Sequence, residues 1–471
     1  MPSKPTSDRA LDHGRTATPL FRAVARPIQA FFRLEAASGI VLLACALVAL
    51  AWVNLLGPDG YRAIFESTVA IAVGDAAVRV TALQIVNDGL MTVFFFLVGM
   101  EIKRELSVGE LRAVRQAVLP AVAAAGGMLV PAAVFLAFNR GGAGGAGWGI
   151  PMATDIAFCV GVLTLLRTRV PHALVMFIMA LAIFDDIGGI LVIALFYGGA
   201  IEPLGIVAAA AVTAILALMS ARCVRSAAAY AVAGALLWYS FHWAGIHAAI
   251  AGVVLGLAIP ARARRAPREV LDALARHAND LVQRPSDEEL DAEAVLEVGD
   301  RLDELEAPLD RFVRHLHPWV AFGIMPLFAL ANSGVDLRAL GASALVGRVT
   351  VGVALGLFVG KQLGIFGFTL AAVRLGLAGA PGGAPLAKLY GVSIVAGIGF
   401  TVALFIASLA YPGRSDLLSE AKLGILAASL ASGLVGALVL RLTPRVGSAG
   451  RDEERPRATA RRLEPGRQPA G

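Results

Sequence analysis

Long runs of apolar residues, separated by short polar links, repeat along most of this chain. A run of roughly 20 apolar residues is long enough to cross the hydrocarbon core of a bilayer as a helix. Some runs are shorter, and short or broken helices are tolerated at membrane depth only where protein or a water-filled cavity satisfies the backbone. The pattern therefore predicts an all-α polytopic membrane protein of about 12 transmembrane helices with a pathway inside the bundle. The expected spans are 39–55, 84–100, 117–138, 152–166, 173–197, 204–220, 227–241, 245–259, 319–333, 350–373, 389–411 and 422–441.

Polar segments divide the chain into parts. We predict that the loop over 261–316, which combines arginines with an acidic block, is helical or partly disordered, and that the Arg- and Pro-rich tail is disordered. Between the first two spans, residues 69–82 alternate around Gly74 and Asp75, which favours a small β-hairpin on the outer face. An ordered loop fits that pattern equally well. The predicted parts are a cytoplasmic tail over 1–33, transmembrane helices 1–8 over 34–260, a cytoplasmic loop over 261–316, transmembrane helices 9–12 over 317–442 and a cytoplasmic tail over 443–471.

Composition and charge agree with a membrane location. The chain is 57% hydrophobic and 16% charged, and its mean hydropathy is +0.73. The net charge of +6 is spread over tails and loops, so it does not form a nucleic-acid-binding stripe. Lys and Arg are more frequent in the loops that share a side with the tails, which places both termini in the cytoplasm. We expect no cleavable signal peptide and no cofactor, and the cysteines lack the spacing of metal ligands.

Few charged residues lie deep in the apolar runs. They are Asp88, Asp155, Asp185, Asp186 and Lys361. A charge at the centre of a transmembrane helix costs ~2.5–3.5 kcal/mol on insertion scales, so the adjacent pair Asp185 and Asp186 needs a reason to be there. Neighbouring helix positions diverge by roughly 100°, so the two carboxylates are predicted to meet different environments. Intramembrane ionisable residues usually mark a transport pathway.

Each of these charges also has a structural interpretation. Asp155 follows Pro151 and Thr154 at the start of a span, where a carboxylate caps free helix amides, although such a carboxylate stays available to a cation. Glu101 and Glu105, at the border of the span 84–100, fit a solvated interfacial cluster better from their spacing alone. The remaining alternatives are a cap or interfacial residue for Asp88, a neutralised pair or salt bridge for Asp185 and Asp186, and a structural counter-ion for Lys361.

The deep carboxylates permit exchange of cations for protons. Na⁺ and Li⁺ are hard ions that need oxygen ligands, and desolvated carboxylates close together also hold protons more tightly. Ion and proton then compete for one site, which is sufficient for antiport. Two other functions use membrane aspartates, namely an intramembrane aspartyl protease and a passive cation channel. The protease would need a Tyr-Asp pair and a Gly-x-Gly-Asp run, which this chain lacks, and a channel would not need a mid-membrane lysine.

Several short segments of distinctive sequence are distributed in order over residues 28–442. The most specific are ATDIAF at 153–158 and ALAIFDDIG at 180–188. The others are VNDGLM at 86–91, FLVGMEIKREL at 96–106, GIHAAIAGV at 245–253, HPW at 317–319, GKQLG at 360–364 and GIGFTVALFIASLA at 397–410. Together these segments resemble the NhaA-type sodium/proton antiporters.

The resemblance implies a fold and a site. The fold would contain inverted repeats with two discontinuous helices that cross at mid-membrane, one opened by Thr154 and Asp155. Asp186 would be the more direct Na⁺ ligand, with Asp185 and Thr154 completing the ion and proton site. Asp155 and Lys361 would balance the facing helix ends, and Lys361 would pair with Asp185 when no Na⁺ is bound. The second broken helix would be the one containing Gly397, Gly399 and Thr401.

The resemblance also implies how the protein works in the cell. Such proteins lie in the bacterial inner membrane and exchange Na⁺ or Li⁺ moving outward for a larger number of protons moving inward. They are therefore electrogenic, and they become active at alkaline pH. The hairpin at 69–82 resembles the family's homodimer contact. Val313 stands where members often carry a Glu, and together with the long acidic loop this departure concerns the pH set point. The positions tied to the cytoplasmic funnel and to pH response are Glu101, Glu105, His247 and Asp88.

Overall fold

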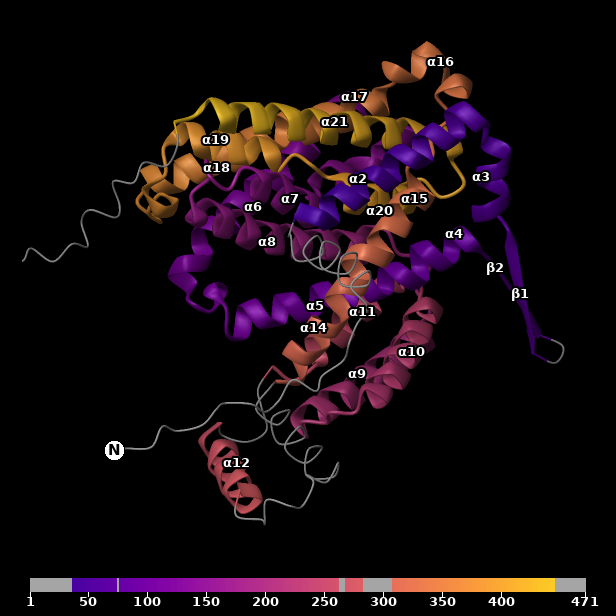
Figure 1. Ribbon diagram of the computed structural model, residues 1–471. Coiled ribbons are helices and arrows are strands. Elements are labelled where there is room, and N and C mark those ends of the chain that lie inside the picture. Colours follow the sequence, from indigo (N-terminus) through magenta and orange to yellow (C-terminus); the bar gives the residue numbers. More distant parts are fainter. Residues whose placement is uncertain (1–35, 74–75, 262–266, 283–306, 445–471) are drawn as a thin grey trace, which may run out of the picture.

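The computed structural model describes residues 36–73, 76–261, 267–282 and 307–444. The predicted tail over 1–33 and nearly all of the predicted tail over 443–471 lie outside these residues, as does much of the loop over 261–316. Within the described residues, helices dominate, and most of them gather into one bundle (Figure 1). The prediction of a polytopic helical architecture, made from the apolar runs, is confirmed.

The helices follow the apolar runs closely, and short 3₁₀ or π-helical segments lie within or between them. In the part of the chain that the structure describes, four π-helical segments interrupt or extend long helices, and a π-helical turn leaves local carbonyl groups without their usual helical partner. These segments are η1 (Trp52–Leu56), η2 (Ile85–Leu90), η5 (Val320–Ile324) and η6 (Gly356–Gly360). The 3₁₀ segments are η3 (Glu110–Arg112), η4 (Ala143–Met152) and η7 (Pro381–Gly383). The α-helices are α2 (Ala36–Ala51), α3 (Pro58–Phe65), α4 (Ala82–Gln84), α5 (Met91–Ser107), α6 (Val114–Phe138), α7 (Ile156–Leu165), α8 (His172–Phe196), α9 (Pro203–Ala221), α10 (Ala227–Trp243), α11 (Ala249–Ala258), α12 (Pro267–Val282), α14 (Pro308–Trp319), α15 (Met325–Asn332), α16 (Leu337–Leu345), α17 (Arg348–Leu355), α18 (Lys361–Arg374), α19 (Leu386–Val395), α20 (Phe400–Ala410) and α21 (Ser415–Leu442).

Membrane-spanning length is reached by several of these helices. Seven helices in the described part of the chain are long and apolar enough to cross a bilayer, and two bent helix pairs raise the number to nine. Three further predicted spans correspond to α10, to the ten-residue helix α11 and to the run from α14 to α15. The count of twelve spans therefore stays a prediction.

The predicted hairpin between the first two spans is present. Strands β1 (Thr68–Val73) and β2 (Ala76–Thr81) pair in antiparallel fashion and project away from the helical bundle (Figure 1). The second strand ends at Thr81 and not at Ala82 as predicted, because Thr81 and Gln84 form a reciprocal capping box that starts α4. Of the two alternatives, a hairpin and an ordered loop, the hairpin is confirmed. Its tip, residues 74–75, lies outside the described residues.

Two apolar segments are bent at short breaks. The 3₁₀ segment η4 and helix α7 meet at 43°, and helices α19 and α20 meet at 46°. The prediction placed the first of these spans at 152–166, but the Gly-rich stretch before Met152 is also ordered as η4. Two tyrosine hydroxyls hold that stretch: Tyr197 Oη donates to the Ala146 carbonyl at 2.8 Å, and Tyr411 Oη donates to the Gly144 carbonyl at 2.7 Å.

Close helix packing positions the helix that carries Lys361. Three glycines spaced four residues apart, Gly356, Gly360 and Gly364, face α6 from η6 and α18. A Cβ atom on Gly364 would lie 2.1 Å from the Gly126 carbonyl oxygen, so only glycine permits this approach. Helix α8, which carries the aspartate pair, also packs on α6. Lys361 and the aspartates are thus placed by a common neighbour.

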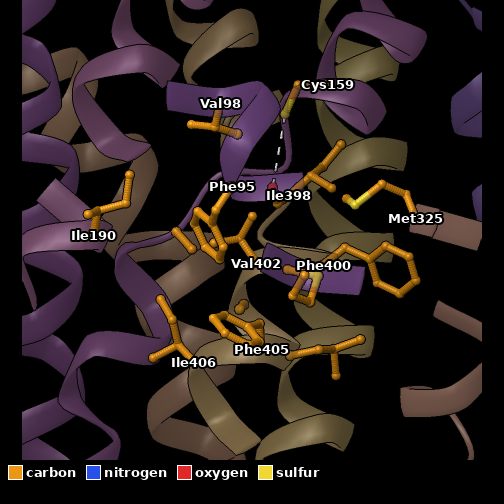
Figure 2. Packing of buried hydrophobic residues seen from close by; sticks show 14 of the residues in the cluster. Phe95, Val98, Cys159, Ile190, Met325, Ile398, Phe400, Val402, Phe405 and Ile406 are labelled. Atoms are coloured by element: carbon orange, nitrogen blue, oxygen red, sulfur yellow. Dashed lines mark hydrogen bonds between the residues drawn. The ribbon is translucent and has the colours of Figure 1, made fainter. Parts of the chain in front are cut away.

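The apolar core continues around the two breaks. The rings of Phe95 and Phe405 lie 5.4 Å apart (Figure 2). The ring of Phe405 is also 6.3 Å from that of Phe328. Ile398 and Phe400, on either side of Gly399, are buried in the same cluster. The polar groups at the breaks therefore lie in an apolar surrounding of low dielectric, where hydrogen bonds and charges interact more strongly than in water.

Candidate functional site

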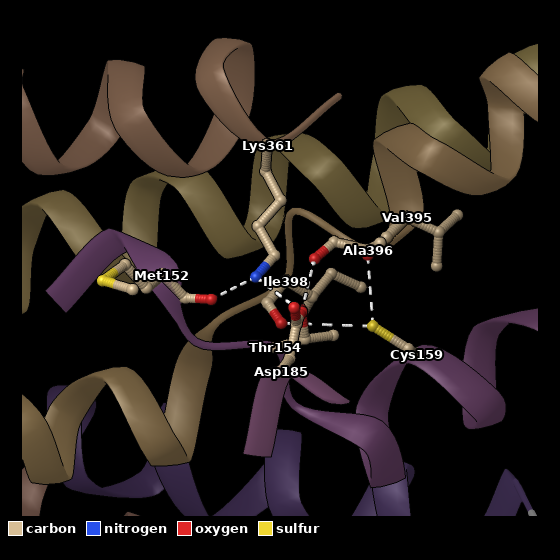
Figure 3. Close-up of polar contacts among 8 residues, drawn as sticks. All are labelled: Met152, Thr154, Cys159, Asp185, Lys361, Val395, Ala396 and Ile398. Atoms are coloured by element: carbon tan, nitrogen blue, oxygen red, sulfur yellow. Dashed lines mark hydrogen bonds and ion pairs between the residues drawn. The ribbon is translucent and has the colours of Figure 1, made fainter. Parts of the chain in front are cut away.

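The two breaks contact each other through backbone and side-chain hydrogen bonds. The Asp155 amide donates to the Ile398 carbonyl at 2.7 Å, and Thr154 Oγ1 lies 3.2 Å from the Ala396 carbonyl oxygen. The Cys159 thiol is buried and donates to the Val395 carbonyl at 3.2 Å. Carbonyl groups freed where α19 ends therefore receive donors from the other bent pair (Figure 3).

Asp155 caps two half-helices at once. Its Oδ1 accepts the Phe158 amide at 3.0 Å, which makes it the N-cap of α7, as its position after Thr154 predicted. Its Oδ2 accepts the Thr401 amide at 3.2 Å and the Thr401 hydroxyl at 2.6 Å, both from the start of α20. One buried carboxylate thus faces the positive ends of two helices, which compensates the dipole of each.

Asp185 lies in a closed ion pair. Lys361 Nζ is 2.8 Å from Asp185 Oδ2 and also donates to the Met152 carbonyl, while Thr154 Oγ1 donates to the same Oδ2 at 2.6 Å (Figure 3). The side chains of both ion-pair partners are 0% exposed. The other carboxylate oxygen, Asp185 Oδ1, has no hydrogen-bond partner among the described residues. The first broken span thus supplies the pair with both a hydroxyl and a carbonyl.

Asp186 has a different environment, as the angle between neighbouring helix positions predicted. Its carboxylate lines a cavity of about 790 Å³ together with Thr154, Asp155 and Thr401. Within the described part of the chain, no hydrogen bond to the Asp186 carboxylate is formed, although the residue is only 8% exposed. Asp185 and Lys361 do not line this cavity. The pair of adjacent aspartates is therefore divided between a closed ion pair and an open cavity.

The cavity extends from the broken helices to the end of α5. Glu101, Arg104 and Glu105 line it, together with His317 and the exposed Trp319 ahead of η5. The glutamates are partly buried, so the interpretation as a purely solvated cluster does not describe them. Apolar side chains make up most of the remaining wall. Carboxylates inside an apolar wall attract cations more strongly than the same groups in water, because the surroundings screen them less.

Asp88 and His247 form a separate cluster that does not line the cavity. His247 Nε2 is 3.9 Å from Asp88 Oδ1, and the His247 side chain is 13% exposed. The Ala249 amide donates to His247 Nδ1 at 3.3 Å, so in the neutral ring the hydrogen is on Nε2 and faces Asp88. The His247 ring also packs edge-on against Phe405 of α20 at 5.4 Å. This contact connects the Asp88–His247 cluster to the second broken helix.

The glycines predicted at the second break are required by close contacts. A Cβ atom on Gly397 would lie 2.6 Å from Ser432 Oγ and 2.7 Å from the Leu357 carbonyl oxygen. A Cβ atom on Gly399 would lie 3.1 Å from the Ala153 carbonyl oxygen. The break is thus packed too tightly for side chains at either position.

Sequence reasoning missed several polar groups around the breaks. The Met152 and Ala396 carbonyls are backbone groups and carry no sequence signal. Ser429 of α21 is different, because its Oγ accepts the Phe400 amide at 3.2 Å. A buried serine in an otherwise apolar span was the signal that could have pointed to it.

Comparison with known proteins agrees with this arrangement. The family described as Na⁺/H⁺ antiporter 1 matches residues 29–440. The Na⁺/H⁺ antiporter NhaA of Anaeromyxobacter sp. (strain Fw109-5) is 65% identical over 95% of this chain and 97% of its own length. NhaA 1 of Myxococcus xanthus (strain DK1622) is 54% identical over 90% of this chain and 95% of its own. NhaA of Rhodospirillum rubrum is 44% identical over 89% of this chain and 98% of its own.

These matches decide between the functions that the aspartates left open. They cover nearly the whole chain, including both bent pairs and the helix that carries Lys361. The protease and channel alternatives are therefore set aside. The chain belongs to the NhaA family of Na⁺/H⁺ antiporters, which are membrane transporters and not enzymes.

Proposed function

We propose that the antiporter exchanges Na⁺ or Li⁺ for protons by competition at Asp186, with Thr154 as an additional oxygen ligand. The observation that carries this proposal is the contrast between the two aspartates. Asp186 faces the cavity without a hydrogen-bond partner among the described residues, whereas Asp185 is in a closed ion pair with Lys361. A hard cation needs free carboxylate oxygens, and these are the oxygens that Asp186 offers.

In the proposed cycle, cation binding releases Asp185 from Lys361. Thr154 is the link, because its hydroxyl contacts Asp185 and its side chain also lines the cavity. When Na⁺ draws the Thr154 oxygen toward Asp186, the Lys361–Asp185 pair loses a neighbour and opens. Asp185 then joins the ligands. When Na⁺ leaves, the site reloads with more than one proton, which makes the exchange electrogenic.

The access route is proposed from the position of the cavity. Glu101 and Glu105 would form the cytoplasmic funnel, since they lie with Lys103 and Arg104 at the end of α5 that the positive-inside rule assigns to the cytoplasm. We place both termini in the cytoplasm and the protein in the bacterial inner membrane. The contact between the bent pairs supports two discontinuous helices that cross at mid-membrane within inverted repeats of a fold with twelve spans.

Activation at alkaline pH is proposed to involve Asp88 and His247 in addition to the funnel glutamates. The contact of His247 with Phe405 gives this cluster a route to the broken helix α20. A homodimer through the 69–82 hairpin is supported by its shape, because a projecting two-stranded ribbon offers unpaired backbone edges to a second copy. Deleting the hairpin should yield monomers in size-exclusion chromatography with light scattering, and an unchanged dimer would refute this contact.

Transport in sealed proteoliposomes tests the site. A pH gradient is imposed, and the internal pH is followed as Na⁺, Li⁺ or K⁺ is added at several external pH values. We expect the gradient to collapse with Na⁺ and Li⁺ but not with K⁺, and this response to disappear in Asp186→Asn. The matched control is Asp416→Asn, because Asp416 pairs with Arg414 on an exposed surface. Wild-type transport by a folded Asp186→Asn protein would refute the assignment.

A further inference from the structure

The start of α20 poses a capping problem at the centre of the bundle. The first amides of a helix have no partner within the helix, and an amide buried in protein, as at Phe400, has no water to replace one. The residue before α20 is Gly399, which has no side chain to act as a cap. The Thr401 amide reaches Asp155 Oδ2, but the Phe400 amide needs a different acceptor. Helix α20 is therefore capped entirely by other helices.

Ser429 supplies that acceptor from an unbroken helix. Its Oγ accepts the Phe400 amide at 3.2 Å, and the residue is 5% exposed on α21. Helix α21 packs against both α19 and α20, so it bridges the break from outside. One turn further along α21, Ser432 faces Gly397, but its buried hydroxyl has no partner among the described residues. The two serines occupy similar surroundings and differ in the hydrogen bond.

The Ser429 hydrogen bond affects how much charge Asp155 presents to the cavity. Asp155 already accepts one donor from α7 and two from Thr401. Without the Ser429 oxygen, the Phe400 amide has no acceptor, and its N–H adds to the partial positive charge at the start of α20. This positive charge lies next to the Asp155 carboxylate and offsets more of its negative charge. The negative potential that Asp155 and Asp186 share in the cavity then falls.

We propose that Ser429 is a positioning residue for Na⁺/H⁺ exchange: by accepting the first amide of α20, it leaves the charge of Asp155 available to the cation in the cavity. This inference rests on the proposed cation site at Asp186. It assigns to α21, which contributes no cavity-lining residue, an indirect influence on Na⁺ affinity through Asp155.

The test separates this role from general packing. Ser429→Ala, Ser429→Thr and Ser432→Ala are reconstituted, and the KM for Na⁺, the maximal rate per folded protein and the melting temperature are measured. We expect Ser429→Ala to raise the KM about tenfold with a smaller change in maximal rate. Ser429→Thr should restore the KM to within about twofold of wild type because it keeps the hydroxyl. Ser432→Ala should leave the KM unchanged.

Several results would overturn the inference. A wild-type KM in Ser429→Ala, or an equal rise in Ser429→Ala and Ser432→Ala, would reduce Ser429 to a packing residue. If Ser429→Ala does not fold, Ser429→Cys fills the same space but accepts a hydrogen bond much more weakly than a hydroxyl does, so the inference expects a raised KM in that variant, and a wild-type KM there would also overturn it. Asp186→Asn is run in parallel. If it transports normally, the cation site itself is wrong; if it is inactive while Ser429→Ala has a normal KM, only the role of Ser429 fails.

Discussion

Replacing Lys361 by methionine removes the positive charge of the ion pair while keeping most of the side-chain volume. Lys361 Nζ contacts both Asp185 Oδ2 and the Met152 carbonyl, and the side chains of Lys361 and Asp185 are both fully buried. The substitution leaves a buried carboxylate whose remaining partner in the described structure is the Thr154 hydroxyl. Removing one member of a buried pair typically costs about 3–5 kcal/mol of unfolding free energy.

The burial of the pair means that solvent screening does not reduce this figure. At roughly 1–2 °C per kcal/mol for a chain of this size, the melting temperature should fall by about 3–10 °C. Thermal denaturation of the purified protein in detergent, followed by size-exclusion chromatography, measures the change. The double variant Lys361→Met/Asp185→Asn should recover at least half of the loss, because it no longer buries an unpaired charge.

Lys388 provides a matched control for this experiment. It lies in α19 and is only 3% exposed, but no carboxylate of the described residues lies within ion-pair distance of it. Lys388→Met should therefore shift the melting temperature by less than about 2 °C. An unchanged melting temperature in Lys361→Met, or equal shifts in the two lysine variants, would refute the stabilising pair with Asp185.

Three further changes test other parts of the site. Thr154→Ala should raise the KM for Na⁺ about tenfold in the proteoliposome assay, while Thr154→Ser should restore it, because the hydroxyl contacts Asp185 and lines the cavity. Gly364→Val should lower the melting temperature by several degrees or prevent folding, since a Cβ there would lie 2.1 Å from the Gly126 carbonyl oxygen; a normal melting temperature would contradict the close approach. Tyr411→Phe should cost about 1 kcal/mol of stability through loss of the hydrogen bond to Gly144, and a melting temperature above wild type would contradict it.

Composition and local pattern were enough to predict much of the fold. Apolar runs of spanning length predicted α5, α6 and α8, because a bilayer leaves helices as the main solution for such runs. The alternation around residues 69–82 predicted the hairpin, and the order Thr154, Asp155 predicted the N-cap of α7. These features are determined by residues that are close together in the chain, so they can be predicted from the sequence alone.

Features that depend on tertiary contacts were less accessible. Sequence reasoning predicted that Asp185 and Asp186 differ, but their divergence around α8 does not say which of them faces the cavity. The Gly-rich η4 has weak helical propensity and was not predicted, because it is held by the hydroxyls of Tyr197 and Tyr411, which follow α8 and α20 and are distant in the sequence. Ser429 was missed for the same reason: the amide that it accepts belongs to Phe400 in another helix, and only the tertiary structure brings the two together.

The glycine contact between α6 and α18 limits how Lys361 can move. Backbone atoms of Gly126 and Gly364 approach so closely that the two helices interlock along the line through Gly356 and Gly360. Sliding one helix past the other would force backbone into backbone, so α6 and α18 must travel as a single rigid body. Separation of Lys361 from Asp185 is then left to a shift of α8 or to rotation of the lysine side chain. The ion pair can therefore open while the contact between α6 and α18 stays intact.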